Sequence, residues 1–367
     1  MSSTAAPEGW LRPNSVDEVV RAIKSAAENS TAIQLRGVVP ADVPVQRRVT
    51  SLLMDDYKAV VDYPARDMTI TVQAGLHVCE LNRILAEEGQ QLPIDCFNPA
   101  MGIGAVIASD ESGPRRFGYG TLRDYVIGIE AVDGQGRIFH AGGRVVKNVA
   151  GYDLCRLLTG SRGALAAITQ VTFRLKPRPV SSRLSVFTFA DANKLQQALE
   201  RLNTTEATPV ILDFAVSEGT AELRIGVEGA DASCDWQIEQ LTADCQAEEV
   251  ATEQNSIAQY CSSFGYRWSC PAVSVLPSQV ATAARMLLKR GCVSVGHAGT
   301  GILYPSRISE VGEPRDAAIE VAAELGGSVT SWDHDHPACS NTPLTQRLLN
   351  TFDPHSVFHW KPSGAES

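Results

Sequence analysis

The sequence predicts an α+β protein built from two domains, and three observations lead to this class. Its length of 367 residues corresponds to two or three domains of ordinary size. Its apolar share of 44% and its charged share of 20% are typical of a globular chain with a sizeable core. After about residue 180, strands and helices are expected in the order β-α-β-β-α, written twice, which is the order of the ferredoxin-like unit.

The first 180 residues mix helices with short strands. A helix is expected from Val16, because Ser15 and Glu18 form a capping box and apolar residues then recur at helical spacing. The stretch 95–123 is rich in Gly, Pro and small residues and predicts loops. A second helix is expected over 77–88, a hairpin over 124–132 and 137–141, and further strands at 32–35, 58–63, 68–74 and the end of 142–179.

The second half predicts one antiparallel sheet with helices. The expected strands are 183–189, 209–216, 220–227, 273–276, 292–297, 299–304 and 327–331, and the expected helices are 191–203, 231–247, 278–290 and 310–325. The stretch 248–272 has low periodicity and predicts a loop. The domains are therefore expected at 1–180 and 181–340, followed by a tail, 341–367, that contains a short helix and returns towards the first domain.

Charge and cysteine usage exclude several classes of protein. The 32 Lys and Arg residues against 42 Asp and Glu residues give a formal charge of −10, which argues against broad nucleic-acid binding. The nine Cys include no C-x-x-C pair, so zinc-ribbon and clustered iron–sulfur patterns are absent, and reduced thiols in a reducing compartment are expected. The N-terminus has no signal-peptide pattern, and no apolar run is long enough to span a bilayer.

Three Gly-rich segments remain once common motifs have been tested. The sequence has no complete G-x-G-x-x-G, no Walker A loop, no H-E-x-x-H and no G-x-S-x-G. The Gly-rich segments are 100–113, 142–154 and 159–168. Glycines let backbone amides approach an anion closely, so these segments are candidates for holding a pyrophosphate, and simple turns are the alternative.

Together these segments resemble a known family. The likeness is carried by RPNSVDEVVRAIKSA near the start, TVQAGLHVCELNRILAEEGQQLPID, GIGAVIAS, RRFGYGTLRDYVIGIEAV, and VVKNVAGYDLCRLLTGSRGALAAITQVTFRLKPRP. The chain is similar to the PCMH-type FAD-binding family of vanillyl-alcohol oxidase and D-lactate dehydrogenases, and most like the FAD-binding subunits of bacterial glycolate oxidase. The resemblance covers residues 10–180 and implies a two-lobed FAD-binding domain, with 181–340 as its ferredoxin-like cap domain.

The resemblance also implies which residues contact FAD. The cofactor would lie between the two lobes of the first domain, with its ring facing the cap. The implied contacts are Arg36, Gly37 and Val38 along the pyrophosphate; Gly102, Ile103, Gly104 and Ala105 through backbone N–H groups; Gly151, Tyr152 and Asp153 near the ribityl chain or ring edge; and Gly160, Ser161, Gly163, Ala164 and Ile168 on the other side. Because 36–44 contains neither His nor Cys, non-covalent FAD is expected, and Cys96 is expected to be a small buried hydrophobe.

Some residues depart from the family pattern. Val38, Val39 and Pro40 replace the small residues usual in the pyrophosphate loop, and Pro40 offers no N–H. Ala105 replaces a glycine, and the glycines of the family's tail are missing after Phe352-Asp353-Pro354. An open crevice beside Val38 and Val39 is therefore a condition for FAD binding.

The sequence does not identify a catalytic base. His297 begins HAGTGILY, where relatives with a metal-assisted site carry His-x-Gly-Asp-Gly-Asn-x-His. The first His stays, but the Asp, the Asn and the last His are replaced by Thr300, Ile302 and Tyr304. A hydrogen-bonded histidine of a cap strand is favoured over a metal ligand, and no metal site is expected. His334 and His336 are candidates for a base or an adventitious metal site, and Arg115 and Arg116 are candidates to anchor an acid substrate. Lys147 and Asn148 are candidates for polar lining near the flavin, and His355 and His359 have no expected partner. The alternative for each candidate is a residue of the surface or of a solvated loop.

The expected function is that of an FAD-dependent oxidoreductase subunit. It would oxidise a short 2-hydroxy acid, glycolate to glyoxylate, and pass electrons to a partner, because the chain lacks iron–sulfur ligands. The resemblance implies a larger flavin subunit and an iron–sulfur subunit as partners, and a cytoplasmic location, peripheral at the inner membrane. A non-catalytic assembly subunit with weakened or lost FAD binding is the alternative, and a stand-alone flavoenzyme acting on another alcohol is a weaker one.

Overall fold

The computed structural model describes most of the chain and divides it into two compact units. The described residues are 10–36, 49–96, 98–143, 152–254, 256–264, 271–308, 313–330 and 343–358. Unit 1 comprises Met1–Ser112, Thr121–Arg178 and Cys339–Ser367, and unit 2 comprises Gly113–Gly120 and Pro179–Ala338. The segment Gly113–Gly120, which lies inside the first domain expected from the sequence, therefore packs with the second unit.

The first sheet of unit 1 has three parallel strands, and one helix packs against it. Its strand order is β1 (Trp10–Leu11), β3 (Val49–Leu53), β2 (Ala32–Arg36). Helix α1 (Val16–Glu28) begins where the capping box predicts, because the Ser15 hydroxyl accepts the Glu18 N–H at 3.4 Å. Its buried face, with Val19 and Ile23, joins Leu52 of β3 in one apolar cluster that also contains residues of the second sheet.

The second sheet of unit 1 has five antiparallel strands. Its order is β4 (Val60–Asp62), β5 (Thr69–Gln73), β9 (Ala166–Arg174), β7 (Val126–Asp133), β8 (Ile138–Gly142). Each of these strands overlaps one expected from the sequence. The remaining elements of unit 1 are α2 (Val78–Glu87), α3 (Ile103–Ser109), α5 (Leu154–Leu158), the short pair β6 (Gln90–Gln91) and β10 (Lys176–Pro177), and the 3-10 turns η1 (Ala65–Asp67) and η2 (Leu122–Asp124).

Helix α3 corrects the prediction that 95–123 consists only of loops. The helix has seven residues and ends at Ser109, and its C-cap residue, Asp110, adopts a left-handed conformation with φ of 52°. It buries Ile103, Val106 and Ile107. A helix this short, with a glycine in its first turn, shows too little apolar periodicity to be distinguished from a small-residue loop.

The C-terminal segment packs on unit 1. Helix α11 (Pro343–Phe352) leads to Asp353, whose carboxylate accepts the backbone N–H groups of Val357 and Phe358, each at 2.8 Å. The Ile33 N–H of β2 donates to the Val357 carbonyl at 2.7 Å. Gly134 leaves the space that Asp353 occupies, since a Cβ at Gly134 would lie 2.1 Å from the Asp353 Oδ1.

Unit 2 contains one antiparallel sheet of eight strands. The order is β14 (Glu249–Gln254), β11 (Ser181–Phe189), β13 (Thr220–Gly229), β12 (Ile211–Ser217), β16 (Cys292–His297), β17 (Ile302–Arg307), β15 (Ala272–Ser274), β18 (Ser328–Thr330). Each half follows the ferredoxin-like order, and the halves meet where β12 pairs with β16. The predicted α+β class and the ferredoxin-like cap are thereby confirmed.

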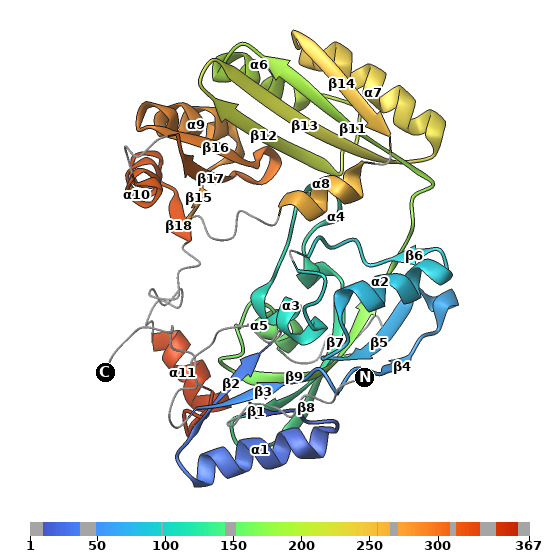
Figure 1. The fold of residues 1–367 in the computed structure, drawn as a ribbon, viewed down its shortest axis with the longest axis vertical. Coiled ribbons are helices and arrows are strands. Elements are labelled where there is room, and N and C mark those ends of the chain that lie inside the picture. Colours follow the sequence, from blue (N-terminus) through green and yellow to red (C-terminus); the bar gives the residue numbers. More distant parts are fainter. Residues whose placement is uncertain are drawn as a thin grey trace. The chain divides into compact units, whose positions relative to one another are not determined.

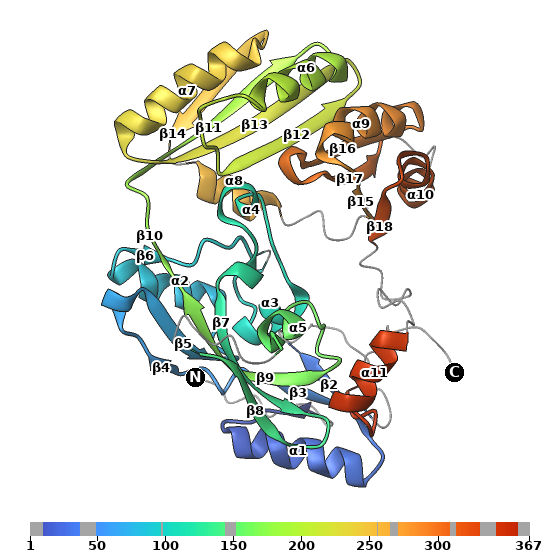
Figure 2. The ribbon, with the colours of Figure 1, turned by 180° about the vertical axis from the view of Figure 1, so that it is seen from behind.

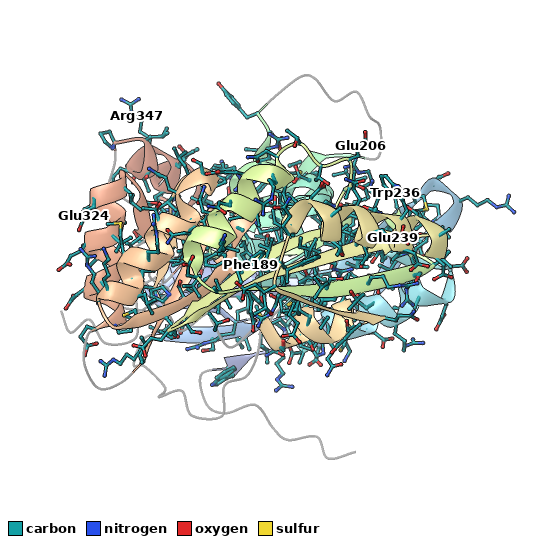
Figure 3. All side chains as sticks on the ribbon, turned by 90° about the horizontal axis from the view of Figure 1, so that it is seen from above. Phe189, Glu206, Trp236, Glu239, Glu324 and Arg347 are labelled. Carbon is teal, nitrogen blue, oxygen red and sulfur yellow. The ribbon has the colours of Figure 1, made fainter. Side chains whose placement is uncertain are left out.

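Helices cover one face of the sheet in unit 2. Figures 1 and 2 show α6 (Ala192–Leu202), α7 (Asp231–Cys245), α9 (Val280–Lys289) and α10 (Pro314–Leu325) on this face, where the main core lies. Of the residues labelled in Figure 3, Phe189 belongs to this core, whereas Trp236 on α7 is 45% exposed. The opposite face carries α8 (Ile257–Ser263) and α4 (Arg116–Tyr119), while η4 (Pro277–Gln279) and η5 (Ala298–Thr300) are turns.

The prediction of a loop over 248–272 was wrong for β14 and α8. Strand β14 lies at the edge of the sheet, pairs only with β11 among the described strands, and is mostly exposed. An edge strand with solvent on most of its surface has no need for the apolar alternation that identifies buried strands.

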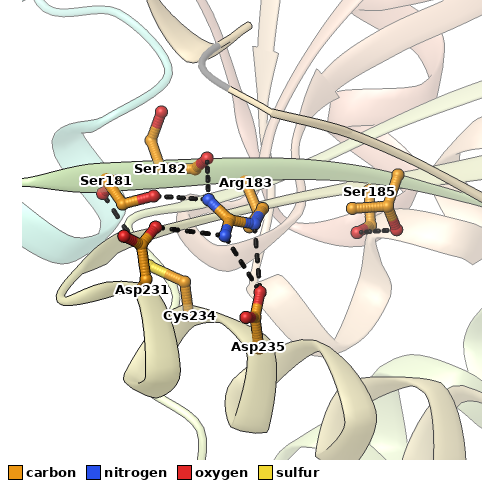
Figure 4. Close-up of polar contacts among 8 residues, drawn as sticks. Ser181, Ser182, Arg183, Ser185, Asp231, Cys234 and Asp235 are labelled. Atoms are coloured by element: carbon orange, nitrogen blue, oxygen red, sulfur yellow. Dashed lines mark hydrogen bonds and ion pairs between the residues drawn. The ribbon is translucent and has the colours of Figure 1, made fainter.

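Arg183 fastens the first turn of α7 to β11, as Figure 4 shows. Its side chain is 7% exposed and contacts the carboxylates of Asp231 at 3.2 Å and Asp235 at 3.0 Å. The guanidinium also donates to the Ser181 hydroxyl and to the Ser182 carbonyl. Every partner belongs to these two elements, so this network is a structural anchor.

Candidate functional site

Three segments that are distant in the sequence come together in unit 1. The turn at 159–164 is tied to α3, because the Gly160 N–H donates to the Ile107 carbonyl at 3.0 Å and the Arg162 N–H to the Ala108 carbonyl at 2.8 Å. The same turn packs on β2, since a Cβ at Gly163 would lie 3.0 Å from the Leu35 side chain. The end of β2, helix α3 and the 159–164 turn therefore form one contiguous region, which we call the convergent site.

The glycines of α3 permit close packing against the protein's own backbone. A Cβ at Gly104 would lie 2.8 Å from the Ala74 Cβ, and a Cβ at Gly102 would lie 3.0 Å from the Ala74 carbonyl oxygen. The Gly104 N–H donates to the Ala74 carbonyl at 2.8 Å, and the Ile103 N–H to the Leu76 carbonyl at 2.9 Å. Both amides therefore already have backbone acceptors, and the expectation that they are offered to a cofactor stays a prediction.

The amides of the 159–164 turn are also used within the chain. The Ser161 N–H donates to the Leu158 carbonyl at 3.1 Å, and the Ala164 N–H to the Ser161 carbonyl at 3.0 Å. The Ala105 N–H likewise donates to the Gly102 carbonyl at 3.0 Å. Polar side chains are thus the better candidates for holding a ligand in this region.

Three buried polar side-chain atoms, two in these segments and one three residues after α3, have no hydrogen-bond partner among the described residues. They are Nε of Arg36, Oγ of Ser112 and Oγ of Ser161. Arg36 ends β2, its Nη2 donates to the Gln34 side chain at 2.5 Å, and its guanidinium lies 5.9 Å from the Trp10 ring. Burial lowers the pKa of Arg36, because the charged guanidinium has lost part of its hydration. An anion beside Arg36 would compensate for that loss.

Ile168 lies at an irregularity of the sheet beside these segments. Ala131 of β7 pairs with Ile168, whereas Glu130 pairs with Gln170, so Thr169 is an extra residue in β9. The Thr169 hydroxyl donates to the Glu130 side chain at 2.8 Å, and its carbonyl accepts the Ala74 N–H at 2.8 Å. β-Bulges of this kind are common next to functional sites, where they redirect the backbone.

The other residues expected to contact the cofactor are either exposed or lie outside the described residues. Asp153 caps α5 by accepting the Arg156 N–H at 3.0 Å, and Tyr152 is 95% exposed. Gly37, Val38 and Gly151 lie outside the described residues, as do Val39 and Pro40. The same holds for Lys147, Asn148, His334, His336 and His359.

Cys96 is half-buried and contacts a carboxylate, so the expectation of a fully buried hydrophobe is corrected. Its thiol lies 3.3 Å from a carboxylate oxygen of Glu111, which is itself buried. Burial raises the pKa of the Cys96 thiol strongly, and the negative charge of Glu111 raises it further. A thiol in this environment is not ionised near neutral pH and is a poor nucleophile.

The candidate residues of unit 2 have specific partners. Arg115 lies 3.7 Å from Glu228, a buried carboxylate that also accepts the Tyr119 hydroxyl at 2.6 Å. His297 donates from Nδ1 to Asp213 at 2.7 Å, which matches the expected hydrogen-bonded histidine of a cap strand. His355 is exposed. The described residues contain no group of three or more potential metal ligands, and no helix among them could cross a membrane.

The comparisons with known proteins identify an FAD binding domain in the N-terminal part of the chain. Residues 7–142 match a family described as FAD binding domain. The glycolate oxidase subunit GlcD of Bacillus subtilis is 24% identical over 88% of this chain and 80% of its own length. The subunit GlcE of Escherichia coli is 32% identical over 51% of this chain and 53% of its own length. A D-lactate dehydrogenase of Archaeoglobus fulgidus is 32% identical over 46% of this chain and 38% of its own length.

A solved structure supports the fold. An alkyldihydroxyacetonephosphate synthase aligns over 95% of this chain and 75% of its own, with a TM-score of 0.71 and 17% identity. FAD is thus the cofactor of this domain, and the orphaned Arg36, Ser112 and Ser161 atoms fit a phosphate-bearing ligand. These three unpartnered atoms are evidence for a bound ligand that comes from this chain's own structure and not from its relatives.

Proposed function

We propose that this chain, which is similar to FAD-linked oxidoreductases, oxidises a short 2-hydroxy acid. Glycolate, which would become glyoxylate, is the first candidate, because subunits named for glycolate oxidase are similar to this chain. D-Lactate is the second, on the ground of the D-lactate dehydrogenase relative.

The convergent site carries this proposal. Arg36 Nε, Ser112 Oγ and Ser161 Oγ are buried polar atoms with no partner in the described part of the chain. A buried polar group without a hydrogen bond costs about 1–3 kcal/mol, so orphaned groups gathered on contiguous segments favour a ligand that satisfies them.

The chain's own residues would bind and orient the cofactor. When bound, FAD supplies a two-electron acceptor for the carbon that carries the substrate hydroxyl. Arg36 would hold a phosphate oxygen through its Nε–H, and the Ser161 and Ser112 hydroxyls would donate to further polar atoms of the cofactor. Non-covalent binding agrees with the un-ionised Cys96 thiol.

We further propose that electrons pass to partner subunits. Subunits GlcD and GlcE are both similar to this chain, which supports assembly with a larger flavin subunit. The sequence has no C-x-x-C pair for an iron–sulfur cluster, so a separate iron–sulfur subunit would carry the electrons onward. Such a complex would be cytoplasmic and peripheral at the inner membrane.

An FAD titration with two matched variants tests the cofactor site. Arg36→Met removes the orphaned donor, while Arg21→Met removes an exposed arginine of α1 in the same unit. Loss of one hydrogen bond to a charged group, about 1.5–3 kcal/mol, should weaken FAD binding by Arg36→Met about 10- to 100-fold. Arg21→Met should bind FAD like the wild type.

Anaerobic addition of glycolate or D-lactate to the FAD-loaded chain tests the chemistry. Bleaching of the flavin absorbance by either acid would support the proposal. A chain that remains colourless with excess FAD would instead identify a non-catalytic assembly subunit. Flavin that binds but is reduced by neither acid would refute the assignment of these substrates.

A further inference from the structure

Residues 352–358, which we call the C-terminal strap, bond to both sheets of unit 1. On the side of the second sheet, the Gly134 N–H in the turn between β7 and β8 donates to the Phe352 carbonyl at 2.8 Å. On the side of the first sheet, the Ile33 N–H of β2 donates to the Val357 carbonyl at 2.7 Å. The strap therefore ties the edge of one sheet to a turn of the other.

The side chains at the end of the strap belong to the core between the two sheets. Val357 is fully buried, and Phe358, which forms a parallel bridge with Ile33, is 7% exposed. Both join an apolar cluster whose members come from both sheets and from α1; they include Ile33, Leu52, Val132 and Ala167. Release of the strap would remove two large side chains from the place where the sheets meet.

The strap is held by few contacts, so it can be released without unfolding unit 1. Helix α11, which the structure describes in full, buries none of its residues. The attachment therefore depends on the residues that follow the helix. Asp353 fixes their shape by accepting the Val357 and Phe358 N–H groups, and Ser356 adopts a left-handed conformation with φ of 53°. Segments with few buried contacts open at a smaller free-energy cost than the core does.

The strand that receives the strap also carries a residue of the convergent site. Ile33 lies three residues before Arg36, whose Nε has no hydrogen-bond partner in the described part of the chain. Leu35, between them, packs against the cluster that contains the strap. The Leu35 side chain also meets the turn that carries Ser161, since a Cβ at Gly163 would lie 3.0 Å from it. One continuous set of contacts thus connects the strap with the convergent site.

We propose that docking of the C-terminal strap and binding of FAD at the convergent site strengthen each other. The inference rests on the proposed function only through its cofactor site, and it needs no particular substrate. A docked strap fixes β2 against the second sheet, and so it holds Arg36 and Ser161 at one separation. FAD that binds both residues would stabilise the same arrangement. Two events that favour one state of a shared element are linked, and each raises the equilibrium constant of the other by the same factor.

The first test measures amide hydrogen exchange of the full chain, at single-residue resolution, with and without saturating FAD. Exchange at Val357, Phe358 and Ile33 should slow by about 5- to 150-fold when FAD binds, the usual range for two coupled sites. The amides of α7 in unit 2 are the internal control, and their exchange should stay the same. This test uses the wild type alone, so it does not depend on the folding of a variant.

The second test measures the dissociation constant of FAD in variants that release the strap from opposite sides. Asp353→Ala removes the acceptor of two strap amides, and Gly134→Ala places a Cβ 2.1 Å from the Asp353 Oδ1. Both should raise the dissociation constant, by no more than the factor found from exchange in the wild type. The control is Leu85→Ala, which removes a buried side chain of α2 outside the strap's cluster. It should lower stability and leave the dissociation constant near that of the wild type.

The outcomes separate this inference from the proposed oxidation. Slower strap exchange with FAD, together with weaker FAD binding in both strap variants, supports the linkage whether or not glycolate or D-lactate reduces the flavin. Equal strap exchange with and without FAD overturns it. So does a Leu85→Ala variant that loses as much FAD affinity as Asp353→Ala, because the effect would then follow from general destabilisation. FAD binding that Arg36→Met leaves unchanged refutes the cofactor site and this linkage together.

Discussion

Removal of the Asp353 carboxylate should loosen the packing of residues 353–358 against β2. Its two oxygens accept the Val357 and Phe358 N–H groups at 2.8 Å each, and Asp353 is 7% exposed. A hydrogen bond to a charged group contributes about 1.5–3 kcal/mol, so two give an upper limit of about 3–6 kcal/mol. Because water would replace part of this, we expect Asp353→Ala to cost about 2–4 kcal/mol and Asp353→Asn about half as much.

Hydrogen exchange of the full chain measures this loss at the amides that donate to Asp353. In Asp353→Ala the amides of Val357 and Phe358 should exchange faster, and so should the Ile33 N–H, which donates to the Val357 carbonyl. Gly134→Ala should reproduce the effect from the opposite side, because its Cβ would lie 2.1 Å from the Asp353 carboxylate. The control is Asp67→Ala, an exposed aspartate of unit 1. Equal exchange at 353–358 in Asp353→Ala and in this control would refute the reasoning.

Three further predictions concern packing and thiols. Gly75→Ala should destabilise unit 1 by about 3 kcal/mol, since its Cβ would lie 1.8 Å from the Met54 carbonyl oxygen; denaturant unfolding equal to wild type would contradict this. Iodoacetamide at pH 7.5 should modify the exposed Cys79 well before Cys155 and Cys245, because burial raises the pKa of those thiols to about 11 and about 12; mass spectrometry would detect the reverse order. For the same reason the free energy of unfolding should fall as pH rises from about 9, where free thiols ionise, towards about 11 and 12, since only the unfolded chain releases these protons early; Cys155→Ser should reduce the slope.

Local signals in the sequence predicted most elements of the fold. The capping box at Ser15 located α1, and the repeated β-α-β-β-α order predicted both halves of the unit 2 sheet. These signals work because each depends on residues within a few positions of one another. The elements that were missed, such as α3 and β14, are short or exposed, and their apolar pattern is correspondingly weak.

The polar pairs of the sites could not be predicted in the same way. Asp213 and His297 are 84 residues apart, and they meet only because the two ferredoxin-like halves join through β12 and β16. Neither half contains the information by itself, since each half could pair through another edge. Because side chains alternate along a strand, Asp213 is expected on the sheet face opposite the one that packs on the core. This alternation is the one local hint in the sequence that Asp213 has a polar partner.

The convergent site shows how one motif can serve two physical purposes. The glycines of 100–113 suggested an anion nest, but the Ile103 and Gly104 amides bond to the β5–α2 connection, and a Cβ at Gly104 would clash there. Close packing therefore explains these small residues without a ligand. What packing does not explain is the burial of Arg36 and Ser161 polar atoms with nothing to bond. Because burial of an unsatisfied donor is unfavourable, we propose that these side chains recognise the cofactor's phosphates and that the glycines act by bringing their segments together.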